Sequence, residues 1–192
     1  MTLRRRWAAL VVTFVVAMAV VPGTPAAAAE IGPLQIINYN SGLCMDIKDR
    51  STSSGATIHQ WTCRRQTNQL WWFTHQPQGN GGFWDIRPQS TILRDPSLCL
   101  TNPGWSKANG HDYKTRDCTA PPWADSSQGF SYTLGLPYAS PLPTPGPQYR
   151  YRLINWFSQM CLEVTGGSTS LGAIIQQAPC DGSAKQLWII NY

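Results

Sequence analysis

Six cysteines divide the chain at equal intervals, and this spacing constrains the fold more than any other feature. They form three pairs whose members are 19 positions apart: Cys44, Cys63, Cys99, Cys118, Cys161 and Cys180. Six cysteines allow 15 pairings, but three equal intervals favour disulfides between consecutive cysteines. A zinc cluster needs cysteines separated by two to four residues, so the spacing argues against one. Each disulfide would contribute roughly 3 kcal/mol to stability.

The cysteine pairs mark three internal repeats. Seven of the 18 residues enclosed by the first pair recur at the same offsets within the third pair, namely Ser51/Ser168, Thr52/Thr169, Ser53/Ser170, Gly55/Gly172, Ala56/Ala173, Ile58/Ile175 and Gln60/Gln177. The loop of the middle pair differs more, although Gly110 has the same offset as Gly55 and Gly172. A glycine shared at one offset predicts a turn with positive φ in each repeat.

Short strands separated by turns fill each repeat. The candidates in the first repeat are rich in Ile, Thr, Tyr and Trp, which favour extended backbone, and they are Gln35–Tyr39, Leu43–Ile47, Thr57–Thr62 and Gln69–Thr74. Four strands in each of three repeats give about twelve strands and little helix. Because such units cannot bury an apolar face alone, we expect them to close around a shared axis into one all-β domain.

Residues 1–29 have the features of a secretory signal peptide. An arginine triplet precedes an apolar run from Trp7 to Val21, and small residues suited to signal peptidase extend to Ala29. The run is shorter than the ~20 residues that span a bilayer, so we expect no membrane span in the mature chain. Cleavage would leave a secreted, extracellular protein that starts at Glu30, in a compartment where disulfides stay oxidised.

The positive charge of the chain comes largely from this first segment. The full sequence carries 15 basic and 10 acidic residues, a net charge of +5. Because residues 1–29 contribute three arginines and no acid, the mature chain has a net charge of only +2. Its densest basic spot is Arg64-Arg65, and no longer basic run remains. A nucleic-acid partner is therefore not expected.

The sequence contains no recognisable arrangement of catalytic or metal-binding residues. Its three histidines, His59, His75 and His111, match no metal-binding spacing. Asp46 and Glu163 have the same offset in different repeats, so a threefold axis would hold them too far apart for the paired carboxylates of a glycosidase. We expect neither an enzyme nor a cofactor or metal site.

Three cysteine-bridged repeats that each end in a Gln-x-Trp sequence resemble the ricin B-type lectin family of carbohydrate-binding modules. The copies begin at Gln69, Gln128 and Gln186, and the middle copy has Phe130 in place of tryptophan. The resemblance implies a β-trefoil, which is a six-stranded barrel capped by three hairpins. It covers essentially the whole mature chain, residues 30–192, with repeats at about 31–75, 84–133 and 149–192.

The resemblance assigns the Gln-x-Trp residues to the framework. It implies that the aromatic residues of the three copies, Trp71, Phe130 and Trp188, lie in the core. It also implies that the glutamines brace each repeat through hydrogen bonds to the backbone.

The resemblance further implies a shallow sugar site in a complete repeat, and the first repeat has the whole set. Asp46 follows the first cysteine by two residues, Trp61 precedes the second by two, and Asn68 directly precedes Gln69. The carboxylate would accept hydrogen bonds from sugar hydroxyls, the indole would stack on the sugar ring, and the amide would add a further hydrogen bond. His59 takes the place of a supporting glutamine, and Gln69 completes the set. We expect Trp61 to be exposed beside Asp46.

The other two repeats depart from this pattern. In the third repeat the aspartate, ring and amide are replaced by Glu163, Ala178 and Lys185. In the middle repeat the same offsets hold Thr101, Arg116 and Ser127, so we interpret this repeat as scaffold. A proline-rich stretch between the two repeats, Leu136–Pro147, is expected to form a stiff loop, with a partner-docking segment as the alternative.

The function that these features favour is a secreted lectin-like protein that binds galactose-type sugars or polysaccharide through the first repeat. A second hypothesis is a trefoil subunit that binds or delivers a partner protein, similar to the binding subunits of cytolethal distending-type toxins. The degraded second and third repeats favour this second hypothesis. A β-trefoil protease inhibitor is a third, less favoured hypothesis, because such inhibitors lack Gln-x-Trp repeats.

Overall fold

The computed structural model describes residues 29–76, 83–119, 125–134 and 149–192. Residues 1–28 of the predicted signal peptide and the stretch Leu136–Pro147 lie outside the described residues. Within the described ranges there are twelve β-strands and six short 3-10 turns, and there is no α-helix. The strands are β1 (Glu30–Asn38), β2 (Cys44–Ile47), β3 (Ile58–Trp61), β4 (Trp71–Gln76), β5 (Phe83–Pro88), β6 (Leu98–Thr101), β7 (Lys114–Asp117), β8 (Gly129–Leu134), β9 (Tyr151–Asn155), β10 (Cys161–Val164), β11 (Ile175–Ala178) and β12 (Trp188–Asn191).

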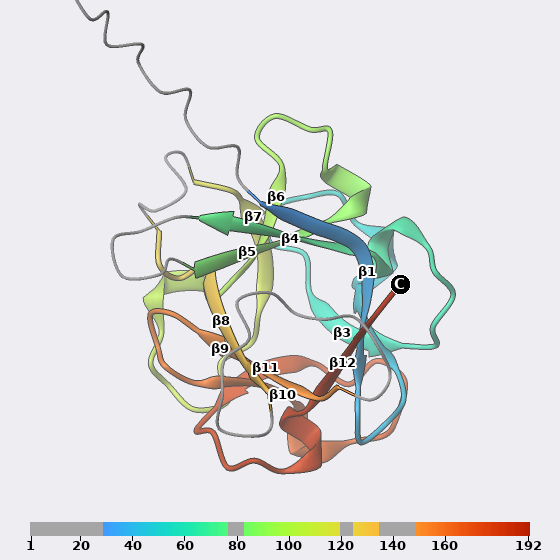
Figure 1. The fold of residues 1–192 in the computed structure, drawn as a ribbon, viewed down its shortest axis with the longest axis vertical. Coiled ribbons are helices and arrows are strands. Elements are labelled where there is room, and N and C mark those ends of the chain that lie inside the picture. Colours follow the sequence, from blue (N-terminus) through green and yellow to red (C-terminus); the bar gives the residue numbers. More distant parts are fainter. Residues whose placement is uncertain (1–28, 77–82, 120–124, 135–148) are drawn as a thin grey trace, which may run out of the picture.

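Six of the strands close into a ring. Strand β1 pairs with β4 and β12, β4 with β5, β5 with β8, β8 with β9, and β9 with β12. The other six strands form the hairpins β2–β3, β6–β7 and β10–β11, one in each repeat. The three repeats follow one another around the molecule from blue to red (Figure 1). This is the β-trefoil that the family resemblance implies.

The hairpins of the three repeats hold one another through equivalent hydrogen bonds. Gln60 in β3 donates to the carbonyl oxygens of Ser168 and Ser170 in the third repeat, at 2.9 and 2.8 Å. Its counterpart Gln177 donates to two carbonyl oxygens in the middle repeat, and Thr115 donates to one in the first repeat. Each repeat therefore fixes a turn of another, which explains why these glutamines recur at the same offset.

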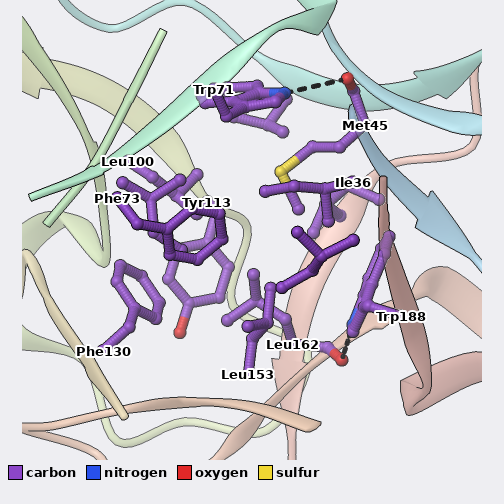
Figure 2. Packing of buried hydrophobic residues seen from close by; sticks show 14 of the residues in the cluster. Ile36, Met45, Trp71, Phe73, Leu100, Tyr113, Phe130, Leu153, Leu162 and Trp188 are labelled. Atoms are coloured by element: carbon purple, nitrogen blue, oxygen red, sulfur yellow. Dashed lines mark hydrogen bonds between the residues drawn. The ribbon is translucent and has the colours of Figure 1, made fainter. Parts of the chain in front are cut away.

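The core lies inside the barrel and joins all three repeats (Figure 2). Trp71, Phe130 and Trp188 are at most 1% exposed, which confirms their expected place. The indole N–H of Trp71 donates to the carbonyl of Met45 at 3.2 Å, and that of Trp188 donates to the carbonyl of Leu162 at 3.1 Å. Replacing such a buried aromatic residue by alanine costs about 3–5 kcal/mol, so these residues anchor the repeats.

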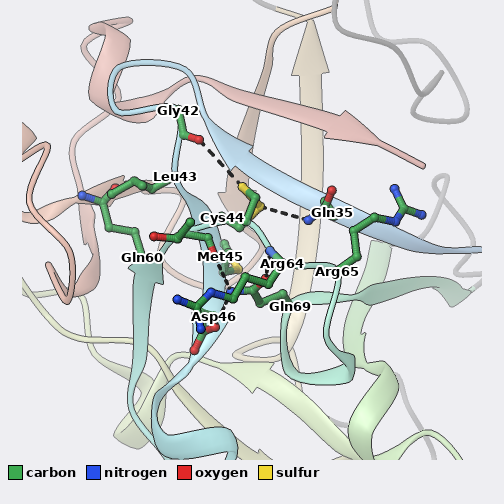
Figure 3. Close-up of a disulfide and its surroundings, with 12 residues drawn as sticks. Gln35, Gly42, Leu43, Cys44, Met45, Asp46, Gln60, Arg64, Arg65 and Gln69 are labelled. Atoms are coloured by element: carbon green, nitrogen blue, oxygen red, sulfur yellow. Dashed lines mark hydrogen bonds between the residues drawn. A yellow bond between two sulfur atoms is a disulfide. The ribbon is translucent and has the colours of Figure 1, made fainter.

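The three disulfides join consecutive cysteines, as the intervals predict: Cys44–Cys63, Cys99–Cys118 and Cys161–Cys180. Figure 3 shows the first of them with Gln69 nearby. Gln69 accepts a hydrogen bond from the backbone N–H of Arg64 at 2.7 Å and donates to the carbonyl of Thr62 at 2.9 Å. Gln128 and Gln186 make the equivalent pair of bonds in their repeats. The glutamines thus brace the segment beside each second cysteine.

Local details differ from the expected strand bounds. Strand β1 begins at Glu30, earlier than predicted, because Glu30 and Ile31 pair with β4. Strand β4 begins only at Trp71, because Thr67–Gln69 forms a 3-10 turn. The backbone N–H of Gln69 donates to the carbonyl of Gln66 in this turn at 2.8 Å, while the Gln69 side chain bonds to the backbone of Thr62 and Arg64. The turn glycines shared by the repeats have positive φ as expected, 91°, 78° and 82° at Gly55, Gly110 and Gly172.

No helix in the described ranges is long and apolar enough to cross a membrane.

Candidate functional site

A hollow of about 340 Å³ lies on the first repeat, beside the hairpin β2–β3. Four of the five predicted site residues line it: Asp46, His59, Trp61 and Asn68. The fifth, Gln69, does not line the hollow and is 1% exposed. Its contact with the site is indirect, through a hydrogen bond to Asp46.

Three donors hold the Asp46 carboxylate in place. His59 Nε2 donates to Oδ1 at 2.9 Å, while Asn68 Nδ2 and Gln69 Nε2 donate to Oδ2 at 2.9 and 2.7 Å. A carboxylate only accepts, so the proton of the first bond belongs to His59 Nε2. Bonds to an ionised group are about twice as strong as neutral ones. The carboxylate is therefore fixed in one orientation, and it is not withdrawn from the hollow.

Asn68 carries an unsatisfied acceptor at the same place. Its Nδ2 donates to Asp46 and also to the carbonyl of Ile47 at 3.2 Å. Its Oδ1 is buried and has no hydrogen-bond partner within the described ranges. A buried acceptor without a partner costs about 1–3 kcal/mol.

Trp61 supplies an aromatic surface, but it is half-buried rather than exposed as expected. Its ring lies nearly parallel to that of His59, with an interplanar angle of 17° and centroids 5.5 Å apart. The third repeat packs beside this ring. A Cβ atom added to Gly172 would lie only 3.8 Å from Trp61 Cζ3. Gly172 and Ile174 both line the hollow. The site thus lies between the first and third repeats, which spacing within one repeat does not reveal.

Basic residues on the rim of the hollow also lie outside the predicted set. Lys48, Arg50 and Arg64 line it together with Asp49, and all four are exposed. Only Arg64 has a signal in the sequence, because it belongs to the densest basic spot of the mature chain.

In the third repeat the equivalent carboxylate also contacts three side chains, but one of them is a cation. Glu163 is 2% exposed and accepts hydrogen bonds from Gln176 and Gln186 at 2.8 and 3.0 Å. Lys185 Nζ lies 2.9 Å from Oε2 of Glu163, and this hydrogen bond raises the pKa of Lys185. Ala178 is buried and offers no ring. The third repeat therefore keeps the scaffold of the site, with its carboxylate neutralised and without an aromatic platform.

The middle repeat has a different surface at the equivalent place. Its hollow of about 550 Å³ is lined by Thr101, Arg116 and Ser127, and also by Trp105. Thr101 bonds to the carbonyl of Cys99, and Ser127 bonds to Asp125. The acid, ring and amide of the first repeat are not reproduced here, as the sequence predicts.

The family model described as ricin-type beta-trefoil lectin domain-like matches residues 26–116 and 141–192. Among the curated proteins, none matches this sequence.

Solved structures of β-trefoil proteins are similar to this chain. The designed 3-fold symmetric protein ThreeFoil has a TM-score of 0.65 at 20% identity, over 83% of this chain and 97% of its own. An exo-beta-1,3-galactanase from Clostridium thermocellum has a TM-score of 0.65 at 22% identity, over 86% of this chain and 30% of its own. The Macrolepiota procera ricin B-like lectin, solved in complex with lactose, has a TM-score of 0.57 at 18% identity, over 88% of this chain and 99% of its own. At these identities the likeness establishes the fold.

Proposed function

The chain belongs to the ricin-type beta-trefoil lectin domain-like family, and from this premise we propose that it is a secreted protein that binds galactose-type sugars through the first repeat. One observation carries the proposal. A fixed carboxylate, an amide side chain and an aromatic ring line one hollow, at Asp46, Asn68 and Trp61. The three disulfides support secretion, because such bonds persist in oxidising compartments.

Each of these groups matches part of a sugar ring. A sugar hydroxyl would donate to Oδ1 of Asp46, which retains a lone pair beyond the bond from His59, whereas Oδ2 already accepts two bonds. The Asn68 side chain also lines the hollow, and the C–H face of the ring would lie on Trp61. A volume of about 340 Å³ suits one or two sugar units.

The structural neighbours support the sugar class. One neighbour is a lectin in complex with lactose and another is a galactanase. The galactanase is an enzyme of which this chain matches 30%, so catalysis is not part of the proposal. A single open site gives weak binding, on the order of 0.1–1 mM, and useful avidity would come from a multivalent glycan surface.

The change Trp61→Ala tests the proposal, with Trp105→Ala in the middle repeat as the matched control. Loss of the stacked ring should weaken binding of lactose by about tenfold, whereas the control should bind as the unchanged protein does. Isothermal titration calorimetry measures the affinity, and thermal unfolding shows that both variants remain folded. Equal affinities for Trp61→Ala and the unchanged protein would place the sugar elsewhere.

A further inference from the structure

The rim of the first-repeat hollow carries positive charge that the proposed sugar contacts do not use. Lys48, Arg50 and Arg64 line the hollow with exposed side chains. None of the three forms an ion pair with any residue that the structure describes. Elsewhere, in contrast, Arg87, Arg94 and Lys185 each lie within 3.1 Å of a carboxylate. Nine of the twelve basic residues that the structure describes form no such ion pair, and three of these nine surround this one hollow.

The acidic groups of the hollow do not cancel this charge. Asp46 lies deep in it and is 5% exposed, with its carboxylate held by three donors. Asp49 is the other carboxylate among the lining residues, and it forms no ion pair within the described ranges. Three cations thus face two carboxylates, and the negative charge of Asp46 is at the base while the positive charge is at the rim.

The backbone at the rim holds charged residues in a conformation that glycine adopts more easily. Asp49 and Arg50 have φ values of 58° and 54°. At the same offsets the third repeat has Gly166 and Gly167, with φ values of 61° and 66°. Left-handed backbone is unfavourable for residues that carry a Cβ. The first repeat therefore keeps an arginine at the rim although glycine fits the turn with less strain.

Arg64 and Arg65, which follow strand β3, point in different directions (Figure 3). Figure 3 shows Arg64 directed toward Asp46 and Arg65 directed away from it. Arg64 lines the hollow, whereas Arg65 donates to the backbone oxygen of Tyr192. Of the two charges, only that of Arg64 faces a ligand in the hollow.

We propose that the ligand of this hollow is an acidic glycan. A neutral sugar unit would bind Asp46, Asn68 and Trp61 at the base, and a carboxylate or sulfate group of the same chain would contact Lys48, Arg50 and Arg64 at the rim. The anionic group lies away from the base, because Asp46 would repel it there. This inference rests on the proposed function, since it names the ligand class of that site.

The test compares three probes of similar size on the oxidised mature chain: lactose, lactose sulfated on its glucose unit, and lactobionic acid, in which a neutral galactose is joined to a unit with a carboxylate. Isothermal titration calorimetry at about 0.05 M and 0.5 M NaCl measures how much of the affinity is electrostatic. The screening length of charges falls severalfold over this range, so an electrostatic contribution is lost at the higher concentration. We expect at least one acidic probe to bind about tenfold more tightly than lactose at low salt and to lose most of that advantage at high salt. The two acidic probes distinguish a sulfate from a carboxylate.

Three variants assign the effect to particular residues. Arg50→Gly introduces the residue of the third repeat, and Arg64→Gln removes the second cation. Each should lower the preference for the acidic probe over lactose by about two- to fivefold, the range for exposed ion pairs. Arg65→Gln is the matched control and should leave the preference unchanged. Arg50→Gly should be no less heat-stable than the unchanged protein, so its effect cannot arise from unfolding.

The outcomes separate this inference from the function on which it rests. Binding of lactose and the acidic probes with equal affinity and no salt dependence would overturn the acidic ligand and leave sugar binding intact. Binding of none of the three probes would overturn both. An equal loss in Arg65→Gln and Arg64→Gln would show a general charge effect and overturn the assignment to the rim.

Discussion

Replacement of Asp46 by asparagine tests whether this carboxylate holds the site together as well as binding a ligand. The carboxylate is buried and accepts from His59, Asn68 and Gln69 at distances of 2.7–2.9 Å. Asparagine keeps one acceptor oxygen and presents an N–H₂ group in place of the other. The change therefore alters hydrogen bonds that join strand β2 to β3 and to the turn before β4.

The loss of folding stability follows from the hydrogen bonds whose acceptor is no longer charged. With the oxygen of the new amide placed toward Asn68 and Gln69, both bonds persist but become neutral. A bond to a charged group contributes ~1.5–3 kcal/mol and a neutral one ~0.5–1.5 kcal/mol, so the pair loses about 2 kcal/mol. His59 limits any further loss, because its other tautomer accepts at Nε2. For a domain of this size, about 2 kcal/mol lowers the Tm by about 4–8 °C.

Glu163→Gln in the third repeat is the matched control. Glu163 also accepts from three side chains, at 2.8–3.0 Å, so its loss of stability should be similar. Thermal unfolding followed by circular dichroism measures both changes, and calorimetry with lactose below both transitions measures binding. We expect both variants to lose stability and only Asp46→Asn to lose sugar affinity. An unchanged Tm for Asp46→Asn would refute the hydrogen-bond reasoning, and loss of binding by Glu163→Gln would refute the assignment to the first repeat.

Two further predictions concern stability. Arg50→Gly should raise the free energy of unfolding by about 0.5–1 kcal/mol in thermal unfolding, because relief of the positive φ exceeds the entropy that glycine gains in the unfolded chain; a clearly lower Tm would mean that Arg50 makes a stabilising contact. Burial raises the pKa of Asp85 to about 6, although Arg87 and Gln76 bond to it. The folded state therefore binds the proton more tightly than the unfolded chain, and stability should fall by up to about 3 kcal/mol as the pH rises from about 4 to 6. Urea unfolding across this range should show the fall in the unchanged protein and little of it in Asp85→Asn.

The repeat made most of the fold predictable. A spacing that occurs three times specifies three copies of the same interaction, so the disulfides and the strand number followed from it, and the family resemblance added the buried aromatic residues. The first and last residues of the strands could not be predicted from this spacing. Strand β4 starts after Gln69, whose side chain bonds to the backbone at Thr62 and Arg64. The residues of a 3-10 turn and of a strand are hard to distinguish by composition when side chains supply the hydrogen bonds.

The site was predictable where its residues lie at fixed distances from the cysteines. The residues that the sequence missed come from elsewhere: Gly172 and Ile174 reach the hollow from the third repeat. Their place depends on the way that the hairpins interlock, which no spacing inside one repeat encodes. The half-burial of Trp61 has the same origin, because that ring packs beside Gly172. The rim cations were missed for another reason, since whether an exposed arginine has a partner is decided only in three dimensions.

Comparison of the first and third repeats shows how one scaffold yields both a site and a closed position. In each repeat the bracing glutamine and one further side chain donate to a buried carboxylate, at Asp46 and at Glu163. The two repeats differ in the residue directly before that glutamine. Lys185 neutralises the carboxylate of Glu163 at 2.9 Å, whereas Asn68 leaves the charge of Asp46 in place and adds an acceptor without a partner. Because a neutralised carboxylate gains less from a sugar hydroxyl than an ionised one, we expect the glycan affinity of the proposed site to depend on this neighbour as much as on the carboxylate itself.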